Sequence, residues 1–308
     1  MDSRQLRYFA AIHEEGSLAR AAERQHVAIS ALSRHLGNLE SELGTLLFIR
    51  EPRGMRPTAA GLRLYEHARN ILRAMTAAEH DLRDEGREVA GSVAVGMAYS
   101  AVKAIGVALM QSVLADYPKV RLSLTESLSG STLIHLMASE VDLALVYNPP
   151  HDPRLRTRAI LQEDMVLLGR PDIIGGTGPI QFDEVLELPL IILRQGLSAR
   201  ALLDNATLRK RLEEHAQLQM NSVSATAGSL LAGIGCAIGT PFFMKEHLDA
   251  ETIVARQIVS PELKRTLYMC EMSDRPATFA LETIRQLCIN LTLDAISSGR
   301  WEAQVALP

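Results

Sequence analysis

The chain has 308 residues, of which 47% are hydrophobic and 22% charged, with 32 basic and 36 acidic side chains. This length exceeds what one hydrophobic core usually organises, so at least two domains are expected, and the balanced composition excludes a disordered chain. The net charge of −4 excludes a protein that is basic throughout, although it permits a small nucleic-acid-binding module on an acidic body. The cysteines form no CxxC or CxxH pair, so we expect no disulfide framework and no zinc site, only buried thiols in a reducing compartment: Cys236, Cys270 and Cys288.

No segment has the pattern of a signal peptide or of a membrane span. The chain opens with polar residues where a signal peptide needs an apolar core. Residues 221–244 contain no charge, but glycines, hydroxyl residues and Pro241 interrupt them. We therefore expect a buried helix, a turn and a buried strand there, in a soluble, cytoplasmic protein that does not bind a membrane.

Apolar spacing predicts three helices in the first sixty residues. They run from Ser3 to Glu15, from Leu18 to Gln25 with Ser17 as the N-cap, and from Ile29 to Leu43. The third would face the core with leucines spaced by 4, 3 and 4 residues: Leu32, Leu36, Leu39 and Leu43. A tight turn between two helices is typical of a helix-turn-helix, placed at about Leu18 to Gly37, although the spacing alone also fits a plain three-helix bundle.

A small hairpin, or wing, is predicted after the third helix. Apolar residues up to Arg50, and the pair Arg56-Pro57, flank a Pro-Arg-Gly turn. Four arginines and one acid, Glu51, gather between Arg50 and Arg63, and no lysine occurs before Lys103. Arginine binds phosphate oxygens and guanine edges with two N–H groups at once, so the cluster favours a DNA-binding surface. The alternative is a solvated charged loop.

The next predicted helix is long and carries a narrow apolar seam. It begins at Thr58, ends near Glu85, and would measure roughly 40 Å at about 1.5 Å per residue. Its apolar residues are spaced by 4, 3, 4, 3 and 4 positions, as in a heptad repeat: Leu64, Ala68, Ile71, Met75, Ala78 and Leu82. This pattern favours pairing with a second helix in a dimer; the alternative is packing on its own domain.

From Gly91 onward, short apolar runs alternate with helical patterns, which indicates α/β domains with parallel sheets. The predicted strands are 92–97, 120–126, 142–147, 190–193, 217–220, 236–239 and 267–272. Helices are expected at 100–117 and 133–137, and a last one near 278–297 returns to the first lobe.

Hydroxyl residues follow several of these strands, where parallel sheets bind ligands beside helix N-termini. The hydroxyls expected to face one cleft between two lobes are Ser100, Ser129, Ser198 and Thr226. Arg194 and Arg200 are the nearest fixed cations along the chain and would suit a carboxylate. The alternatives are ordinary N-caps for the hydroxyl residues and solvated side chains for the arginines.

Enzyme motifs are absent from the sequence. There is no GxxxxGK[ST], HExxH or GxSxG pattern. The glycines at 175–178 are expected in a loop, and those at 233–239 precede a strand, whereas a dinucleotide fingerprint follows one. His13-Glu14-Glu15 is expected on the surface of the first helix. No catalytic residue, cofactor or metal site is predicted.

Five motifs, in their order and spacing, resemble the LysR-type transcriptional regulators: GSLARAAER at 16–24, ALSR at 31–34, LESELG at 39–44, LFIR at 47–50 and PTAAG at 57–61. The resemblance implies a winged helix-turn-helix DNA-binding domain at 1–58 and a linker and dimerisation helix at 59–90. It further implies a two-lobed α/β effector domain at 91–308, similar to periplasmic binding proteins. Lobe I would hold 91–168 and 267–308, and lobe II 169–266.

The same resemblance implies roles for individual residues. Contacts with double-stranded promoter DNA fall on Ser17, Ser30, Ser33, Arg34, Arg50, Arg53 and Arg56. Effector contacts fall on Ser100, Ser129, Ser198 and Thr226, with Arg194 and Arg200 nearby. One departure concerns the start of the recognition helix, where this chain has Ala28-Ile29 in place of the family's usual polar pair. Ala28 lacks a capping side chain, which costs about 1 kcal/mol, and Ile29 cannot hydrogen-bond a base. Another is Ala98, where many members carry a hydroxyl.

The implied function is transcription regulation by a homo-oligomer, a dimer or a tetramer, under control of a small effector, expected to bear a carboxylate. RNA polymerase is a further candidate partner. The alternatives are a small-molecule-binding protein or enzyme on the same α/β lobes, and a helical scaffold that uses the long helix. Neither explains the arginines of the first sixty residues.

Overall fold

The structure, a computed structural model, describes residues 1–52, 54–83, 89–176, 178–193 and 205–306. Internal contacts divide the chain into two compact units, Met1–Gly86 and Arg87–Pro308. The finer division into three parts, with boundaries at residues 58 and 90 and with the predicted lobe limits, stays a prediction.

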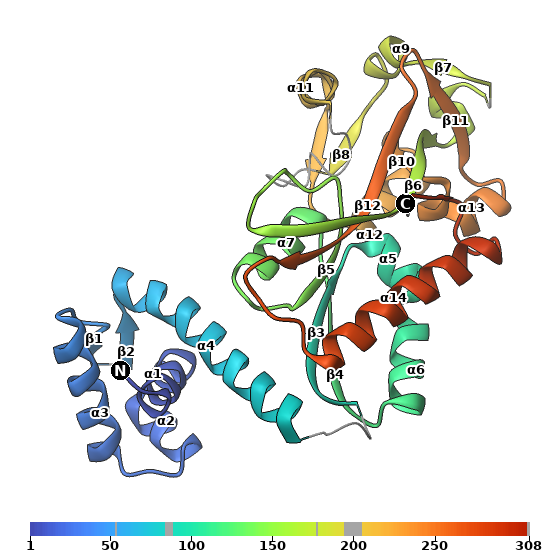
Figure 1. Cartoon of the computed structure of the whole chain (residues 1–308). Coiled ribbons are helices and arrows are strands. Elements are labelled where there is room, and N and C mark those ends of the chain that lie inside the picture. The colour runs from blue at the N-terminus through green and yellow to red at the C-terminus, as the bar shows by residue number, and fades with distance from the viewer. Residues whose placement is uncertain (53, 84–88, 177, 194–204, 307–308) are drawn as a thin grey trace. The chain divides into compact units, whose positions relative to one another are not determined.

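The first unit is a helical domain with a small hairpin, drawn in blue to cyan in Figure 1. Its elements are α1 (Ser3–Glu15), α2 (Leu18–Arg24), α3 (Ile29–Leu43), β1 (Phe48–Glu51), β2 (Gly54–Pro57) and α4 (Ala59–Arg83). The two strands pair antiparallel, with Phe48 opposite Pro57 and Glu51 opposite Gly54. The predicted helices and the predicted wing are therefore present.

The ends of the first helices follow from their terminal residues. The Asp2 carboxylate accepts a hydrogen bond from the Gln5 backbone, and the Gln5 side chain accepts one from the Asp2 backbone, which forms a capping box. Gly16 and Gly44 end α1 and α3 in the left-handed conformation that glycine adopts without strain. Ser17 occupies the N-cap position of α2, as predicted, although its hydroxyl makes no capping hydrogen bond.

The core of the first unit lies between α1, α3 and the start of the wing. It is formed by buried apolar side chains, among them Leu6, Phe9, Ile12, Leu32, Leu36, Leu39, Leu47 and Phe48. The rings of Phe9 and Phe48 lie 5.4 Å apart between centroids and join α1 to β1. Leu43 was expected in this core but is 40% exposed, because the core contacts of α3 end one turn earlier, at Leu39.

Close backbone approaches fix the wing and α4 against the helices. A Cβ atom on Gly54 would lie 2.3 Å from the carbonyl oxygen of Gly16, and one on Gly61 would lie 2.1 Å from that of Leu47. The Glu40 carboxylate accepts a hydrogen bond from the Leu47 backbone at 2.7 Å. Only glycine fits at both close approaches, since real Cβ contacts with backbone oxygen atoms are longer than 3 Å.

Gly61→Ala should therefore destabilise the first unit by roughly 1–3 kcal/mol, the cost of overpacking, although alanine is the better helix former. Gly37→Ala on α3 is the matched control, because a Cβ there meets nothing within 4 Å. That change should stabilise its helix by about 0.5–1 kcal/mol. Hydrogen exchange of peptides from α3 and α4 in the full-length protein would measure both effects. Equal protection in the two variants would contradict the close approach at Gly61.

The predicted seam of α4 divides into two parts. Ala68 is buried and Leu64 packs against the core of the first unit. Ile71 and Met75, further along, are 38% and 41% exposed. The first half of the seam thus packs on its own unit, and the two apolar residues that follow remain accessible.

The second unit contains a mixed sheet with helices. Its strands are β3 (Ala90–Met97), β4 (Lys119–Glu126), β5 (Leu143–Tyr147), β6 (Leu155–Gly169), β7 (Ile180–Gln181), β8 (Ile191–Leu193), β9 (Leu218–Met220), β10 (Ala237–Gly239), β11 (Val254–Val259), β12 (Leu263–Met272) and β13 (Gln304–Val305). Its helices are α5 (Tyr99–Ala101), a π-helix (Val102–Gly106), α6 (Val107–Asp116), α7 (Ser129–Met137), α8 (Pro171–Ile174), α9 (Phe182–Leu186), α11 (Ala206–His215), α12 (Val223–Leu231), a 3₁₀ helix (Pro241–Met244), α13 (Lys245–Asp249) and α14 (Phe279–Ser297).

Among the described residues, nine strands form one sheet in the order β4-β3-β5-β12-β6-β11-β7, with β10 and β13 also paired to β6. β3 pairs parallel with β4 and β5, whereas β12 is antiparallel to both β5 and β6. The expected parallel pairing is present among β3, β4 and β5, but the sheet as a whole is mixed. Four strands of this sheet were not predicted: β6, β7, β11 and β13. The start of β6 does not have the pattern of a buried strand, because Arg156, Thr157 and Arg158 are polar and exposed.

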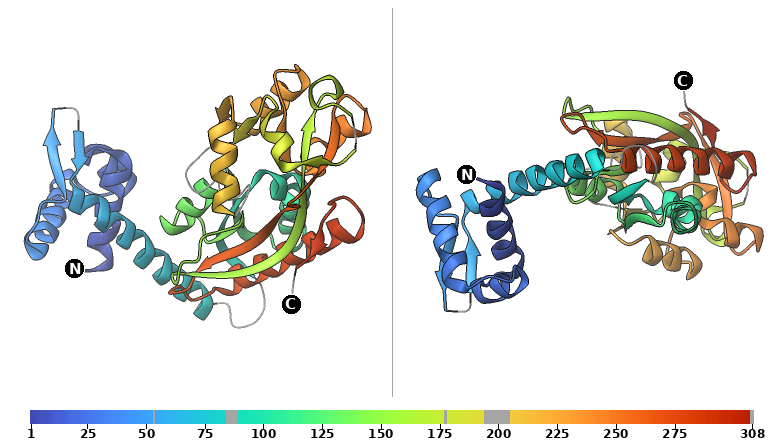
Figure 2. Two further views of the ribbon diagram at one scale, coloured as in Figure 1. Left: turned by 90° about the horizontal axis from the view of Figure 1, so that it is seen from above. Right: turned by 60° about the horizontal axis from the view of Figure 1, so that its bottom comes forward.

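Two main hydrophobic cores stabilise the second unit. One lies between β3, the helices after it and α14, which Figure 2 shows in red beside the sheet. The other gathers residues of β6, α9 and β10. The three cysteines are buried and free, and burial raises the pKa of each thiol to about 12. This agrees with the prediction of buried, unreactive thiols.

The uncharged stretch 221–244 forms α12, a turn and β10, followed by a 3₁₀ helix. The helix and strand are those expected from the sequence. In the described parts of the chain, no helix is both long and apolar enough to cross a membrane. The predicted helix at 100–117 is interrupted, since a π-helical segment separates α5 from α6.

Candidate DNA interface and effector cavity

The outer side of α3 carries most of the side chains predicted to meet DNA bases. Ser30 and Arg34 are exposed and Ser33 is half-buried, while Leu32, Leu36 and Leu39 face the core. Ile29, the first residue of α3, is 51% exposed. Ser17 is half-buried directly before α2. The first turns of α3 thus present two serines, one arginine and one isoleucine on an accessible surface.

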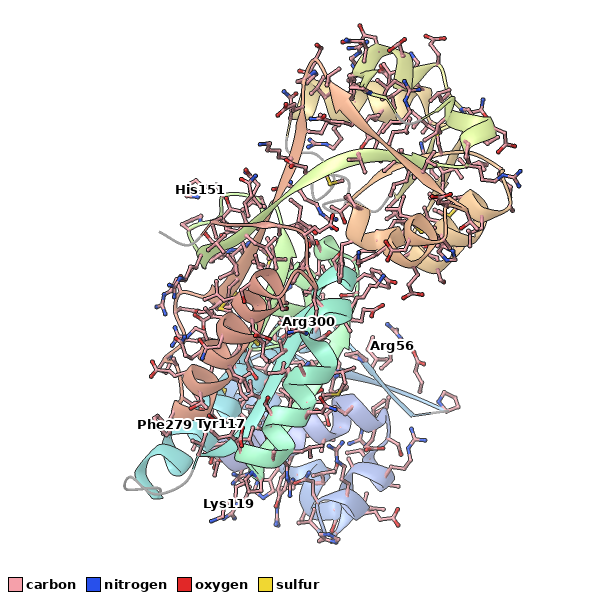
Figure 3. All side chains as sticks on the ribbon, turned by 90° about the vertical axis from the view of Figure 1, so that its right-hand side faces the viewer. Arg56, Tyr117, Lys119, His151, Phe279 and Arg300 are labelled. Atoms are coloured by element: carbon pink, nitrogen blue, oxygen red, sulfur yellow. The ribbon has the colours of Figure 1, made fainter. Side chains whose placement is uncertain are left out.

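The wing contributes two described arginines. Arg50 Nη2 donates to Ser33 Oγ at 2.9 Å and so joins β1 to α3. Arg56, on β2, pairs with Glu51 at 2.6 Å, and Figure 3 shows its position on the hairpin. Both partners of this ion pair are exposed, so it contributes at most about 1 kcal/mol and Arg56 can exchange Glu51 for a phosphate at little cost. Arg53 lies outside the described residues.

His13 on α1 is half-buried against α4, whereas Glu14 beside it is exposed, as the sequence suggested for both. Its ring stacks on Tyr65 with 3.8 Å between centroids and an interplanar angle of 11°. Its Nε2 atom is buried and makes no hydrogen bond within the described residues. Burial lowers the pKa of His13; the charge of Glu14 opposes the shift and that of Arg69 adds to it. His13 is therefore a neutral, stacked residue of the first unit.

The packing of α1 on α4 should consequently weaken as the pH falls below about 6.5. In this range a histidine in the unfolded chain becomes protonated, whereas His13 in the folded protein, with its lowered pKa, stays neutral to a lower pH. The folded pKa is lowered, so the unfolded state binds more protons and stability rises with pH through this window. Hydrogen exchange of α1 and α4 peptides across the pH range would follow this change. His13→Phe, which keeps the stacked ring, should flatten the dependence, and His67→Phe, at an exposed site on α4, should not. An unchanged slope in His13→Phe would contradict the assignment.

The second unit contains a cavity of about 90 Å³. By the same measure of volume, one buried water needs roughly 10–15 Å³. It therefore has room for several waters or a small organic molecule. The lining residues come from the segments after β3 and β4, including the starts of α5 and α7, from β5, β8, α12, β10 and β12, and from the 3₁₀ helix and the residue before it: Ala98, Tyr99, Ser100, Leu128, Ser129, Tyr147, Ile191, Leu193, Val223, Thr226, Ala237, Ile238, Gly239, Thr240, Phe243 and Arg265.

Three of the predicted effector residues meet in this cavity. Ser100, Ser129 and Thr226 line it, and each is at least 94% buried. Ser129 begins α7, and its Oγ accepts a hydrogen bond from the Tyr147 backbone at 3.1 Å. The Thr226 hydroxyl donates to the Ser222 carbonyl at 2.9 Å. The strand-to-helix topology thus brings together hydroxyls that are far apart in the sequence.

The other three predicted residues, Arg194, Ser198 and Arg200, lie outside the described residues. Among the described residues that line the cavity, Arg265 on β12 carries the positive charge. It was not among the residues predicted from the sequence. Arg265 shares its side of the strand with the buried Leu263 and Leu267, and its register partner on β6 is Glu163. A charged residue at an inward position of an alternating strand was the available signal.

Arg265 and Glu163 form a buried ion pair beside the cavity. Arg265 Nε donates to Glu163 Oε2 at 2.8 Å, and the two side chains are 14% and 0% exposed. Trp301 Nε1 donates to the other carboxylate oxygen at 2.8 Å. Arg265 Nη2 donates to Ser100 Oγ at 3.0 Å and lies 3.4 Å from Thr240 Oγ1. Glu163 thereby orients a guanidinium that holds two of the cavity's hydroxyls.

Tyr147 completes the polar side of the cavity. The Arg265 guanidinium lies over its ring, 3.7 Å from the centroid. The Tyr147 hydroxyl is buried and lacks a hydrogen bond of good geometry to any described group. Burial raises the pKa of this phenol well above 10, and the Arg265 charge opposes the rise. The hydroxyl therefore stays protonated and can donate a hydrogen bond to a bound molecule.

Comparison with known proteins identifies both units. Residues 3–62 match the family described as "Bacterial regulatory helix-turn-helix protein, lysR family", and residues 86–292 match the "LysR substrate binding domain". The chain is 30% identical over 300 residues to the nitrogen assimilation regulatory protein nac of Escherichia coli (strain K12), which covers 97% of this chain and 96% of the relative.

Solved structures share the fold. A full-length OxyR from Pseudomonas aeruginosa matches with a TM-score of 0.70, 21% identity and 94% coverage of both chains. Full-length CbnR, solved in complex with its target DNA, matches with a TM-score of 0.59 and 22% identity over 94% of this chain and 100% of CbnR. The relatives are regulators of transcription, which excludes the enzyme alternative. The chain belongs to the LysR family of DNA-binding transcriptional regulators.

Proposed function

We propose that this regulator binds promoter DNA through α3 and the wing, and that a small effector with a carboxylate or similar oxyanion binds in the cavity of the second unit. The observation that carries the effector class is the set of hydrogen-bond donors around Arg265. The DNA contacts proposed are those predicted from the sequence: Ser17, Ser30, Ser33, Arg34, Arg50, Arg53 and Arg56.

The described cavity lining offers more donors than acceptors. Ser129 Oγ and Ser100 Oγ each accept a hydrogen bond, from the Tyr147 backbone and from Arg265, so their hydroxyl hydrogens are available to a ligand. The Tyr147 hydroxyl is a further donor without a described acceptor, and the Arg265 guanidinium supplies the positive charge. No Asp or Glu belongs to the described lining, because Glu163 lies behind Arg265. A ligand with oxygen acceptors matches this arrangement.

The rest of the lining sets the size and character of the effector. Leu128, Ile191, Leu193, Val223 and Phe243 provide apolar walls. A small metabolite with one oxyanion and a short apolar portion would satisfy both parts. Ser198, Arg194 and Arg200 remain proposed as further contacts, on the resemblance alone.

Self-association is part of the same proposal. The exposed Ile71 and Met75 of α4 are available to a second copy of the helix, as expected for a dimer that pairs into a tetramer. Effector binding would change regulation only if it favours one conformation over another. We further propose a cytoplasmic location and contact with RNA polymerase, as the family resemblance implies.

Fluorescence anisotropy tests the proposal. The full-length protein is titrated into labelled intergenic DNA from upstream of its own gene, at two salt concentrations and with unrelated competitor DNA. Saturable binding that survives competitor and weakens with salt is expected. Small mono- and dicarboxylates are then added and the footprint, DNA bend and transcription are recorded. If the protein binds no DNA, the proposed DNA-binding role is wrong. If DNA binding and transcription respond to a neutral compound but to no carboxylate, the proposed effector class is wrong.

A further inference from the structure

The start of α3 presents an apolar side chain where a DNA-reading helix needs contact with bases. Ile29 is the first residue of α3 and is 51% exposed, between the exposed Ala28 and Ser30. Ala28 occupies the N-cap position without a capping side chain. Packing among the described residues of the first unit does not explain an exposed isoleucine here, since the core contacts of α3 begin at Leu32.

The position of Ile29 on the helix fixes what it can reach. Residues four apart lie on one face, so Ile29 is adjacent to Ser33, the hydroxyl that accepts the hydrogen bond from Arg50 of the wing. Ser30 and Arg34 form the neighbouring row. Ile29 thus lies on the flank of α3 on which the wing arginine also lies. In helix-turn-helix proteins, the first residues of the recognition helix contact base edges in the major groove.

We infer that Ile29 reads a thymine by van der Waals contact with its 5-methyl group. An isoleucine side chain has no donor or acceptor, so it cannot distinguish bases by hydrogen bonds. The thymine methyl is the one apolar group that base pairs display in the major groove, and apolar side chains contact it there. This inference rests on the proposed DNA contacts of α3 and adds a base preference to them: each half-site contains a thymine whose methyl group contributes to affinity.

Removing that methyl group from the DNA tests the inference directly. The full-length protein first selects its preferred duplex from a randomised pool. Each thymine of that duplex is then replaced singly by deoxyuridine, which lacks only the 5-methyl group, and affinity is measured by anisotropy. We expect one thymine per half-site at which the replacement weakens binding by roughly threefold to fivefold, the effect of losing one buried methyl-sized group.

Ile29→Ala separates this contact from other effects of the methyl group. In that variant the thymine and deoxyuridine duplexes should bind with equal affinity at the sensitive position, as a double-mutant cycle requires. Leu46→Ala is the matched control, because Leu46 is 64% exposed but follows the far end of α3, and it should keep the full sensitivity.

Three results would overturn the inference. They are no thymine with methyl sensitivity, the same sensitivity in Ile29→Ala as in the unmodified protein, and selection of no preferred sequence at all. Failure of the proposed function is distinguishable, since a protein without DNA binding fails before any deoxyuridine is introduced.

Discussion

Arg265→Met is expected to lower the free energy of unfolding of the second unit by roughly 3–5 kcal/mol, because it leaves the Glu163 carboxylate buried without its cation. The Glu163 side chain is fully buried, and Trp301 Nε1 would be its remaining described hydrogen-bond donor. Urea unfolding followed by the fluorescence of Trp301, the chain's single tryptophan, measures the effect.

A neighbouring ion pair supplies the control for this prediction. Lys264 and Asp164 are register partners on the same two strands, but they are 39% and 65% exposed, with 3.6 Å between charged atoms. Lys264→Met should therefore cost less than about 1 kcal/mol. The double variant Glu163→Gln with Arg265→Met should recover much of the loss, since no buried charge remains unpaired. If Arg265→Met were no more destabilising than Lys264→Met, the buried pair would not have the role assigned to it.

The same variants separate stability from ligand recognition. The double variant restores folding but lacks the guanidinium that donates to Ser100 and lies over Tyr147. If an oxyanion binds to Arg265, the double variant should be folded and yet fail to respond to the effector. A folded double variant that responds normally would place the effector's anionic group on another residue.

The sequence predicted the elements that depend on local patterns. The leucines of α3 recur at helical spacing, Gly16 and Gly44 end their helices, and two short strands pair where the wing was expected. Ser100, Ser129 and Thr226 could be placed in one cavity because ligands of α/β sheets bind where strands end and helices begin.

The features that sequence reasoning missed depend on contacts between distant residues. Arg265 and Glu163 are register partners on β12 and β6, 102 positions apart, and β6 itself was not predicted. The alternation of Leu263, Arg265 and Leu267 marks Arg265 as inward-facing, but only the register with β6 shows that Glu163 is its partner. The partial burial of His13 was missed for the same reason, since its stacking partner Tyr65 lies on α4, far along the chain.

Trp301→Ala should destabilise the second unit by roughly 3–5 kcal/mol, the usual cost of deleting a large buried ring. Trp301 is 0% exposed and stacks on Phe242 with 5.6 Å between ring centroids. The change also removes the hydrogen bond to Glu163 Oε1. Urea unfolding followed by circular dichroism measures the loss, because the variant lacks the fluorescent residue.

Trp301→Phe distinguishes the ring from its N–H group. It keeps most of the stacking on Phe242 but leaves one oxygen of the buried Glu163 carboxylate without its donor, which costs about 1–3 kcal/mol. Glu163 orients Arg265, and Arg265 holds Ser100 at the cavity wall, so Trp301→Phe should also weaken effector binding although Trp301 does not line the cavity. Retained effector affinity in a destabilised Trp301→Phe protein would confine Trp301 to packing. If the Trp301→Phe protein binds the effector more weakly under conditions in which it is fully folded, Trp301 is a positioning residue for the effector site.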